Sequence, residues 1–339
     1  MKKEKECIIC KKKAQLVIEN SDAYIKGEKY NIYYCQFCNT SFASPHTVNN
    51  TIYDYIYRQP EIVRGYNRYA LYAEEIKHKK NALNYLAEKE GMYYAVKEIL
   101  DNYKKEIKIL EVGSGLGYLT FAIAKEGYNI NGLDISLDAV NKARTRFGDY
   151  FICEDVFKYA DEHPALFDLV ILTEVIEHVP EPINFCKGLA RLLKPGGRLI
   201  ISTPNKSAHR LQEYWYTELP PVHLTWFSED SFLEIARQMN LKASFFDFTV
   251  FNKNHLDVTK YKFAESYFRK RKITTTLNPD GTVIQPMSII SYTASQKVKI
   301  YFKKIMRSIL DPIVIRFFTD KKNPARNGVL CAILQNTGD

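Results

Sequence analysis

Four of the seven cysteines in this 339-residue chain form two Cys-x-x-Cys pairs, Cys7 with Cys10 and Cys35 with Cys38. Two such pairs present four thiolates on two short hairpins, a spacing that suits a tetrahedral zinc site. The other three cysteines stand singly among apolar residues and do not form a disulfide pattern. The pairs therefore predict a closed, structural zinc site, with iron–sulfur or redox chemistry as the alternatives.

A second candidate site is the glycine-rich segment 110–118, which reads Leu-Glu-Val-Gly-Ser-Gly-Leu-Gly-Tyr. It lies at the turn from an apolar strand to a helix, where a doubly wound sheet binds nucleotides. Gly113, Gly115 and Gly117 would let a ligand approach the backbone closely. The third glycine comes one residue too early for a dinucleotide fingerprint, and Tyr118 takes the required place. This spacing disfavours a dinucleotide ligand.

The glycine segment resembles motif I of the class I S-adenosylmethionine (SAM)-dependent methyltransferases. The resemblance continues through Asp134, Asp155 and the segments 167–180 and 192–200, which look like the fourth and fifth motifs of that family. It implies an α/β fold, namely a Rossmann-like seven-stranded sheet with helices on both faces. The N-terminal cysteines look like the zinc-ribbon module found ahead of some bacterial methyltransferases of sugar and secondary-metabolite pathways.

The resemblance also assigns roles to the cofactor residues. The amino-acid part of SAM would pack over the glycine turn, and Asp134 would accept hydrogen bonds from the ribose hydroxyls. Ile135 would pack on the adenine ring, and Asp155 would recognise the amino group of the adenine. The cofactor contacts implied are Glu111, Gly113, Gly115, Gly117, Asp134, Ile135, Asp155 and Thr173.

Candidate catalytic residues follow two of the expected strands, those over 167–173 and 198–203. Glu174 and His178 belong to a Glu-x-x-Glu-His pattern that resembles the ubiquinone-type O-methyltransferases, where it can hold a divalent metal near the acceptor oxygen. We interpret Glu177 and His178 chiefly as ties between the strand end and the next helix, with the metal site as the alternative. His223, on a loop expected to cover the acceptor, is the candidate general base.

Alternating strands and helices are expected to position these residues. We predict strands over 107–112, 128–134, 150–153, 167–173, 198–203, 242–251 and 328–335, the last antiparallel to 242–251. Helices are predicted over 119–126, 137–147, 183–193 and 228–239, and residues 194–197, Lys-Pro-Gly-Gly, read as helix-to-strand punctuation. The expected domains are a zinc ribbon over 1–48, a helical connector or lid over 49–106, the SAM-binding domain over 107–252 and 328–339, and an insertion over 253–327.

The net charge of +9 comes from the insertion, because sixteen Lys and Arg and only five Asp and Glu lie between residues 253 and 326. Within it, Val298, Phe302, Ile305 and Ile309 would share one face of a helix and Lys299, Lys303, Lys304 and Arg307 the other. A solvated face, an anion-binding surface, a dimer contact or a peripheral membrane contact through 296–318 would each explain this pattern.

The sequence contains no apolar run long enough to span a bilayer and no signal peptide, so we expect a cytoplasmic protein. The motifs favour a SAM-dependent methyltransferase acting on an anionic or glycan-like small molecule, at a hydroxyl of a sugar, nucleotide-sugar or glycan-like acceptor. A zinc-ribbon RNA methyltransferase is the first alternative, although the Asp/Asn-Pro-Pro-aromatic signature of amino-nitrogen methylation is missing after the fourth strand. A non-catalytic SAM-binding protein is the second.

Overall fold

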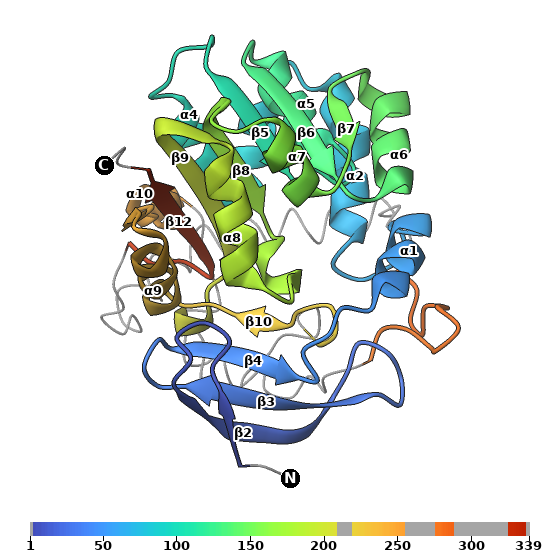
Figure 1. The fold of residues 1–339 in the computed structure, drawn as a ribbon. Helices are drawn as coiled ribbons and strands as arrows, with labels where there is room; N and C mark the ends of the chain where they lie inside the picture. Colours follow the sequence, from blue (N-terminus) through green and yellow to red (C-terminus); the bar gives the residue numbers. More distant parts are fainter. Residues whose placement is uncertain (1–2, 209–218, 255–274, 288–324, 337–339) are drawn as a thin grey trace.

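The computed structural model describes residues 3–208, 219–254, 275–287 and 325–336 (Figure 1). These residues form two β-sheets, one of five strands near the N-terminus and one of seven strands flanked by helices. Leu277, within the short described part of the insertion, forms a β-bridge with Ile25 of the N-terminal module. None of the helices in the described segments is both long and apolar enough to cross a membrane.

The larger sheet has the strand order β11-β12-β9-β8-β5-β6-β7. Neighbouring strands from β9 to β7 run parallel, whereas β12 is antiparallel to both β9 and β11. This order confirms the predicted seven-stranded α/β fold. The strands are β5 (Lys108–Val112), β6 (Asn129–Asp134), β7 (Phe151–Cys153), β8 (Phe167–Thr173), β9 (Leu193–Pro204), β11 (Lys242–Phe245) and β12 (Val329–Gln335).

Helices cover both faces of this sheet because its central strands alternate between two cores. Leu169 and Ile171 of β8 pack with α2 to α6, while Val170 and Leu172 pack with α7 to α9. The helices are α1 (Asn50–Arg58), α2 (Asn67–Glu75), η1 (Ile76–His78), α3 (Ala82–Ala87), α4 (Gly91–Leu100), α5 (Tyr118–Lys125), α6 (Leu137–Phe147), α7 (Val156–Glu162), η2 (Ile176–His178), α8 (Pro182–Arg191), η3 (Lys206–Ala208), α9 (Glu229–Met239) and α10 (Thr249–Asn254).

The smaller sheet, here called the cysteine module, lies below the larger one in Figure 1 and has the order β1-β2-β3-β4-β10. Its first four strands are β1 (Glu4–Glu6), β2 (Lys13–Asp22), β3 (Lys29–Cys35) and β4 (Thr40–Ser44). The fifth, β10 (Thr225–Trp226), comes from a distant part of the chain and pairs antiparallel with β4. The sheet of the module therefore extends beyond residues 1–48.

The predicted strand over 242–251 is wrong in its second half. Strand β11 ends at Phe245, and after Asp247 the chain turns into α10. Asp247 Oδ1 accepts a hydrogen bond from Thr249 N at 2.8 Å, which favours the helical turn. Phe248 and Phe251, three residues apart, are both buried against α4, so their spacing follows a helix instead of a strand.

The predicted strand over 198–203 begins earlier than expected. Phe167 of β8 is opposite Leu193, but Leu169 is already opposite Arg198, so residues 194–197 bulge out of a longer β9. Pro195 and the two glycines that follow it are therefore part of a bulge inside the strand and not only a connection between helix and strand.

Candidate functional site

The turn between β5 and α5 requires glycine at two positions, where the backbone is left-handed and a Cβ would collide with a neighbouring side chain. Gly113 has φ +74°, and a Cβ there would lie 2.4 Å from Val175 Cγ2. Gly117, with φ +78°, lies behind the turn and packs against Phe151, where a Cβ would come within 2.5 Å of the ring. Gly117 is therefore needed for packing of the helix on the sheet, and its contact with the cofactor stays a prediction.

Asp134, at the end of β6, is fixed in position by the backbone on either side of it. Its Oδ2 accepts from Gly115 N at 2.7 Å and its Oδ1 accepts from Ser136 N at 2.8 Å. The residue is 8% exposed, and burial raises the pKa of its carboxyl group. Each carboxylate oxygen can accept more than one hydrogen bond, so Asp134 can still receive donors from a ligand.

Glu111 lies beneath the same turn and is 3% exposed. Its Oε2 accepts a hydrogen bond from the Thr120 hydroxyl group on α5. Burial raises the pKa of Glu111 to about 8. A positively charged ligand above the turn would favour its ionised form.

A cavity of about 1620 Å³ opens above these residues. It is larger than the several hundred Å³ typical of a site for one small ligand, so a cofactor and an acceptor fit together. Seven of the eight predicted cofactor residues line it, Gly117 being the exception. The seven are Glu111, Gly113, Gly115, Asp134, Ile135, Asp155 and Thr173.

One end of the cavity has an apolar rim. Ile135 is 74% exposed, Leu137 59% and Phe157 41%, which are high values for large apolar side chains. Asp155, next to this rim, caps α7 because its Oδ1 accepts from Phe157 N at 2.9 Å. The rim therefore offers apolar surface to a ligand, with the Asp155 carboxylate beside it.

The wall at the other side of the cavity contains two histidines, and Glu174 lies in the same wall. His178 Nδ1 lies 2.6 Å from the Val222 carbonyl oxygen, so this nitrogen can donate a hydrogen bond to the loop that carries His223. The ring centroids of His178 and His223 are 4.8 Å apart. The structure therefore brings together the predicted catalytic residues, which are 45 positions apart in the sequence.

Both histidines are kept neutral by their surroundings. Burial lowers the pKa of His178 to about 4. Burial, reinforced by the charges of His178 and Arg68, lowers the pKa of His223 well below its usual range. His223 is 7% exposed, and its Nδ1 has no hydrogen-bond partner among the described residues. This nitrogen is available to a ligand in the cavity.

Glu177 lies directly behind the histidines and is 1% exposed. Its Oε2 accepts from the Thr203 hydroxyl group at 2.9 Å, which ties η2 to the end of β9, as predicted for a structural role. One ligand atom each of Glu177, His178 and His223 nevertheless lies within 4.8 Å of the others. This is a compact cluster, close enough for a metal ion, although it uses His223 where we had expected Glu174.

Aromatic side chains cover the cavity from α1 and α2. Of the tyrosines in these helices and between them, Tyr53, Tyr57, Tyr66 and Tyr69 line it, whereas Tyr72 packs in the core.

Sequence reasoning missed Arg68 and Glu90, which also line the cavity and lie 2.9 Å apart, from Nε to Oε1. Arg68 also donates from Nη2 to the Tyr69 hydroxyl group at 2.7 Å. A charged residue inside a tyrosine-rich stretch was the available signal.

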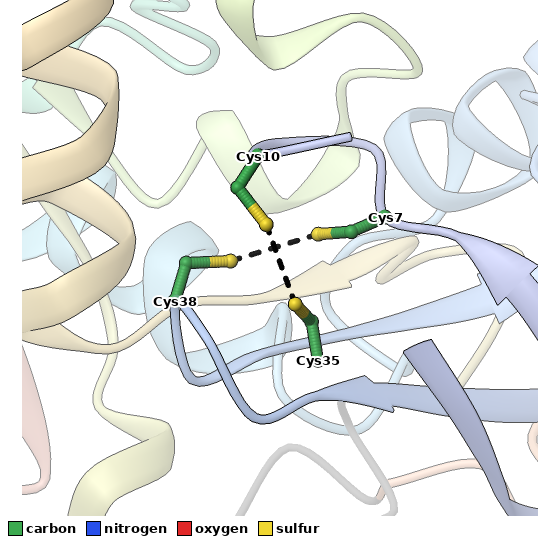
Figure 2. Close-up of side chains that lie close together, drawn as sticks. All are labelled: Cys7, Cys10, Cys35 and Cys38. Atoms are coloured by element: carbon green, nitrogen blue, oxygen red, sulfur yellow. Dashed lines mark hydrogen bonds between the residues drawn. The ribbon is translucent and has the colours of Figure 1, made fainter. Parts of the chain in front are cut away.

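The four cysteines of the module point toward one another (Figure 2). The Sγ atoms of Cys7 and Cys38 are 3.6 Å apart and those of Cys10 and Cys35 are 3.4 Å apart. A zinc ion at about 2.3 Å from four sulfurs requires separations of about 3.8 Å, so the four thiols fit a zinc ion after a small expansion. Ile9 N, 3.4 Å from Cys7 Sγ, supplies the type of hydrogen bond that supports a ligating sulfur.

A doubly wound sheet, a glycine turn after β5, an acidic residue at the end of β6 and a shared cavity form a ligand site at the carboxyl ends of the parallel strands, the arrangement found in class I SAM-dependent methyltransferases. The chain belongs to the methyltransferase-domain family, whose model matches residues 57–243.

The chain is similar to the ubiquinone biosynthesis O-methyltransferase of Pectobacterium carotovorum, with 37% identity over 106 residues, 30% of this chain and 44% of the relative. It is also similar to the Yersinia pestis enzyme of the same name, with 33% identity over 130 residues, 37% of this chain and 49% of the relative. The chain thus matches about half of the length of these relatives.

Solved structures with similar folds include a SAM-dependent methyltransferase from Archaeoglobus fulgidus, with a TM-score of 0.42, 13% identity and coverage of 79% of this chain and 99% of that one. Another is phosphoethanolamine N-methyltransferase 2 of Haemonchus contortus in complex with SAM, with a TM-score of 0.43, 16% identity and coverage of 71% and 51%.

Proposed function

We propose that this protein transfers a methyl group from SAM to a hydroxyl group of a small sugar, nucleotide-sugar or glycan-like molecule. The observation that carries the proposal is a single cavity that contains both the glycine turn with Asp134 and the buried pair His178 and His223. A cofactor bound at the glycine turn and an acceptor bound at the two histidines would meet inside this cavity.

SAM would lie along the carboxyl ends of β5, β6 and β8. Its adenine would occupy the apolar rim beside Ile135 and Asp155, its ribose would bind Asp134, and its amino-acid part would lie over the glycine turn with Thr173 beside it. The sulfonium and ammonium groups of SAM are cationic, and the buried carboxyl of Glu111 below the turn would stabilise them.

Methyl transfer is an in-line displacement that breaks the S–CH₃ bond of SAM, forms an O–CH₃ bond and leaves S-adenosylhomocysteine. The acceptor must also lose its hydroxyl proton, which we assign to His223. Its buried Nδ1 has no hydrogen-bond partner among the described residues and can accept this proton from a hydroxyl group bound in the cavity. The roles proposed for His178 Nε2 and Glu174 are to bind and orient the acceptor, together with the tyrosines.

A divalent metal at Glu174, Glu177 and His178 is the alternative mechanism, and the proximity of Glu177, His178 and His223 favours testing it. These residues would hold the ion, which would polarise the acceptor oxygen when bound. Dialysis against chelator, followed by return of zinc alone, distinguishes the two mechanisms, because the chelator also removes zinc from the cysteine module. A transfer that depends on the histidine alone would return with zinc, whereas a metal-dependent transfer would return only when Mg²⁺ or Mn²⁺ is also added.

A zinc-ribbon RNA methyltransferase is less well supported by the charges around the cavity. Its described lining contains nine acidic residues and only three Lys and Arg. RNA, with one anionic phosphodiester per nucleotide, would be repelled from such a wall more strongly than a small acceptor with two phosphates or none, and a cationic cofactor would not be repelled. The basic residues of 296–318 lie outside the described residues, as does the predicted helix over 298–310, so the four explanations of this charge pattern stay predictions.

Transfer of labelled methyl groups from SAM to small-molecule and RNA fractions of the native cell tests this proposal. We expect the label in a small polar product, and we expect His223→Gln to abolish most of the transfer while retaining SAM binding. His163→Gln, a change in a histidine at the end of α7 and outside the cavity, is the matched control. Label in the RNA fraction alone would overturn the choice of acceptor, and full transfer by His223→Gln would overturn the choice of base.

A further inference from the structure

The loop that carries His223 is held between the cavity wall and the cysteine module. Leu224 N, one residue further on, donates to the Glu177 carbonyl oxygen in η2 at 2.8 Å. The carbonyl oxygen of the same Leu224 accepts from Ala43 N in β4, also at 2.8 Å. The residue after the proposed base is therefore bonded to the catalytic wall through its N–H and to the module through its C=O.

The module also contacts the loop before and after this point. Tyr24 N donates to the Pro220 carbonyl oxygen at 2.8 Å, three residues before His223. Two residues after His223, the chain enters β10, which pairs with β4 (Figure 1). The loop therefore has hydrogen bonds to the module on both sides of the histidine, and its position depends on that of the module.

The second cysteine turn, Cys35–Cys38, fixes the chain where the His223 loop and β10 lead into α9. The Cys38 carbonyl oxygen accepts from Ser228 Oγ at 3.3 Å and from Ser231 Oγ at 3.1 Å, and these two serines form the capping box of α9. Thr40 Oγ1 lies 2.8 Å from Ser231 Oγ and 3.2 Å from Cys38 Sγ. The network joins the sulfur cluster to the start of α9, directly after β10.

This network is buried and densely connected. Thr40 and Ser231 are both 0% exposed, and Ser228 is 2% exposed. Water cannot readily replace a hydroxyl group lost at such a site, so the remaining partners would be left without a bond or would move. A small displacement here would be transmitted along β10 to His223, because the strand between them is only two residues long.

We propose that the cysteine module positions the proposed base, with Thr40 and Ser231 as positioning residues that link the Cys35–Cys38 turn to the His223 loop. This inference rests on the proposed role of His223. The module would thus influence the acceptor site, whereas the cofactor site consists of the β5 turn and Asp134. A displacement of about 1 Å at a catalytic group can cost on the order of 100-fold in rate.

The test uses the full chain with Thr40→Val, which keeps the shape and removes the hydroxyl group, and Thr40→Ser, which restores it. Ser21→Ala, in β2 of the same module, is the control, because its hydroxyl group bonds only to the neighbouring Asp22 carbonyl in the structure. Ser231→Ala provides a second route to the same network if Thr40→Val folds poorly. Two readouts need no acceptor: amide hydrogen exchange of residues 219–228 and of 129–136, and the affinity for S-adenosylhomocysteine.

We expect Thr40→Val to accelerate exchange of 219–228 about tenfold, the effect of losing roughly one buried hydrogen bond, and to leave 129–136 and the affinity unchanged. Thr40→Ser should restore slow exchange. With an acceptor in hand, Thr40→Val should lower kcat and leave the KM for SAM unchanged. Unchanged exchange of 219–228 would overturn the inference, and so would equal acceleration in both segments with weaker ligand binding, which would mean general destabilisation. Failure of the parent protein to bind S-adenosylhomocysteine would instead refute the proposed function.

Discussion

Replacing Asp134 with alanine should weaken the binding of S-adenosylhomocysteine. In the structure the carboxylate is held in place by Gly115 N and Ser136 N at 2.7 and 2.8 Å, so it need not reorganise to meet a ribose. Two charge-assisted hydrogen bonds would be lost, each worth about 1.5–3 kcal/mol. The lower bound of their sum, about 3 kcal/mol, corresponds to a loss of roughly 150-fold in affinity.

Titration calorimetry at constant pH and salt measures this change, and Asp138→Ala is its matched control. Asp138 lines the same cavity from the first turn of α6 but is exposed. If Asp134 binds the ribose, Asp138→Ala should change the affinity by less than about threefold, because exposed charges are strongly screened. Thermal unfolding without ligand confirms that each variant is folded. Equal weakening by both variants, or unchanged affinity in a folded Asp134→Ala protein, would refute the assignment.

Three further predictions concern metal, pH and charge. The purified protein should contain about one zinc per chain, and Cys35→Ser should lose it and unfold the module, because metal binding there contributes folding energy; metal analysis showing full occupancy would contradict this. The low pKa of His178, about 4, predicts that stability falls as the pH drops from about 6.5 to 4, because unfolding then takes up a proton. His178 should contribute about 3 kcal/mol to this loss, measured as the difference between the parent and His178→Gln in urea unfolding, because the lowered pKa of His223 destabilises both proteins as the pH falls; parallel curves for the two proteins would argue against it. Replacing four basic residues of the insertion with glutamine should leave SAM binding intact but reduce turnover of an anionic acceptor, most strongly at low salt; the positions are Lys299, Lys303, Lys304 and Arg307. Equal, salt-independent turnover of the parent and the variant would show that these four residues take no part in acceptor recognition.

Much of the larger sheet could be predicted because its signals are local. The fully apolar β8, the glycine turn and the exact bounds of α6 follow from patterns within a dozen residues. The strand over 242–251 was misassigned because alternating and helical spacing coincide in a short run rich in phenylalanine. Burial of Phe248 and Phe251 against α4, a tertiary contact, decides between them.

The acceptor side of the site could be predicted only in part, because it depends on contacts between distant segments. His178 and His223 were each recognisable as candidates, but nothing in the sequence places their rings 4.8 Å apart. The pairing of β10 with β4 is equally hidden, since a two-residue strand has no periodicity to detect. The Arg68–Glu90 pair joins two helices and depends on how they pack.

Titration of the purified protein with SAM and with S-adenosylhomocysteine tests the central claim most directly. A methyltransferase site of this construction should bind both at micromolar concentrations, on the order of −8 kcal/mol, with one site per chain. The expected heats should disappear when the protein is first saturated with the other ligand, because both occupy the cavity above the glycine turn. Absence of binding up to about 1 mM by a folded protein, which corresponds to a free energy weaker than about −4 kcal/mol, would contradict the account.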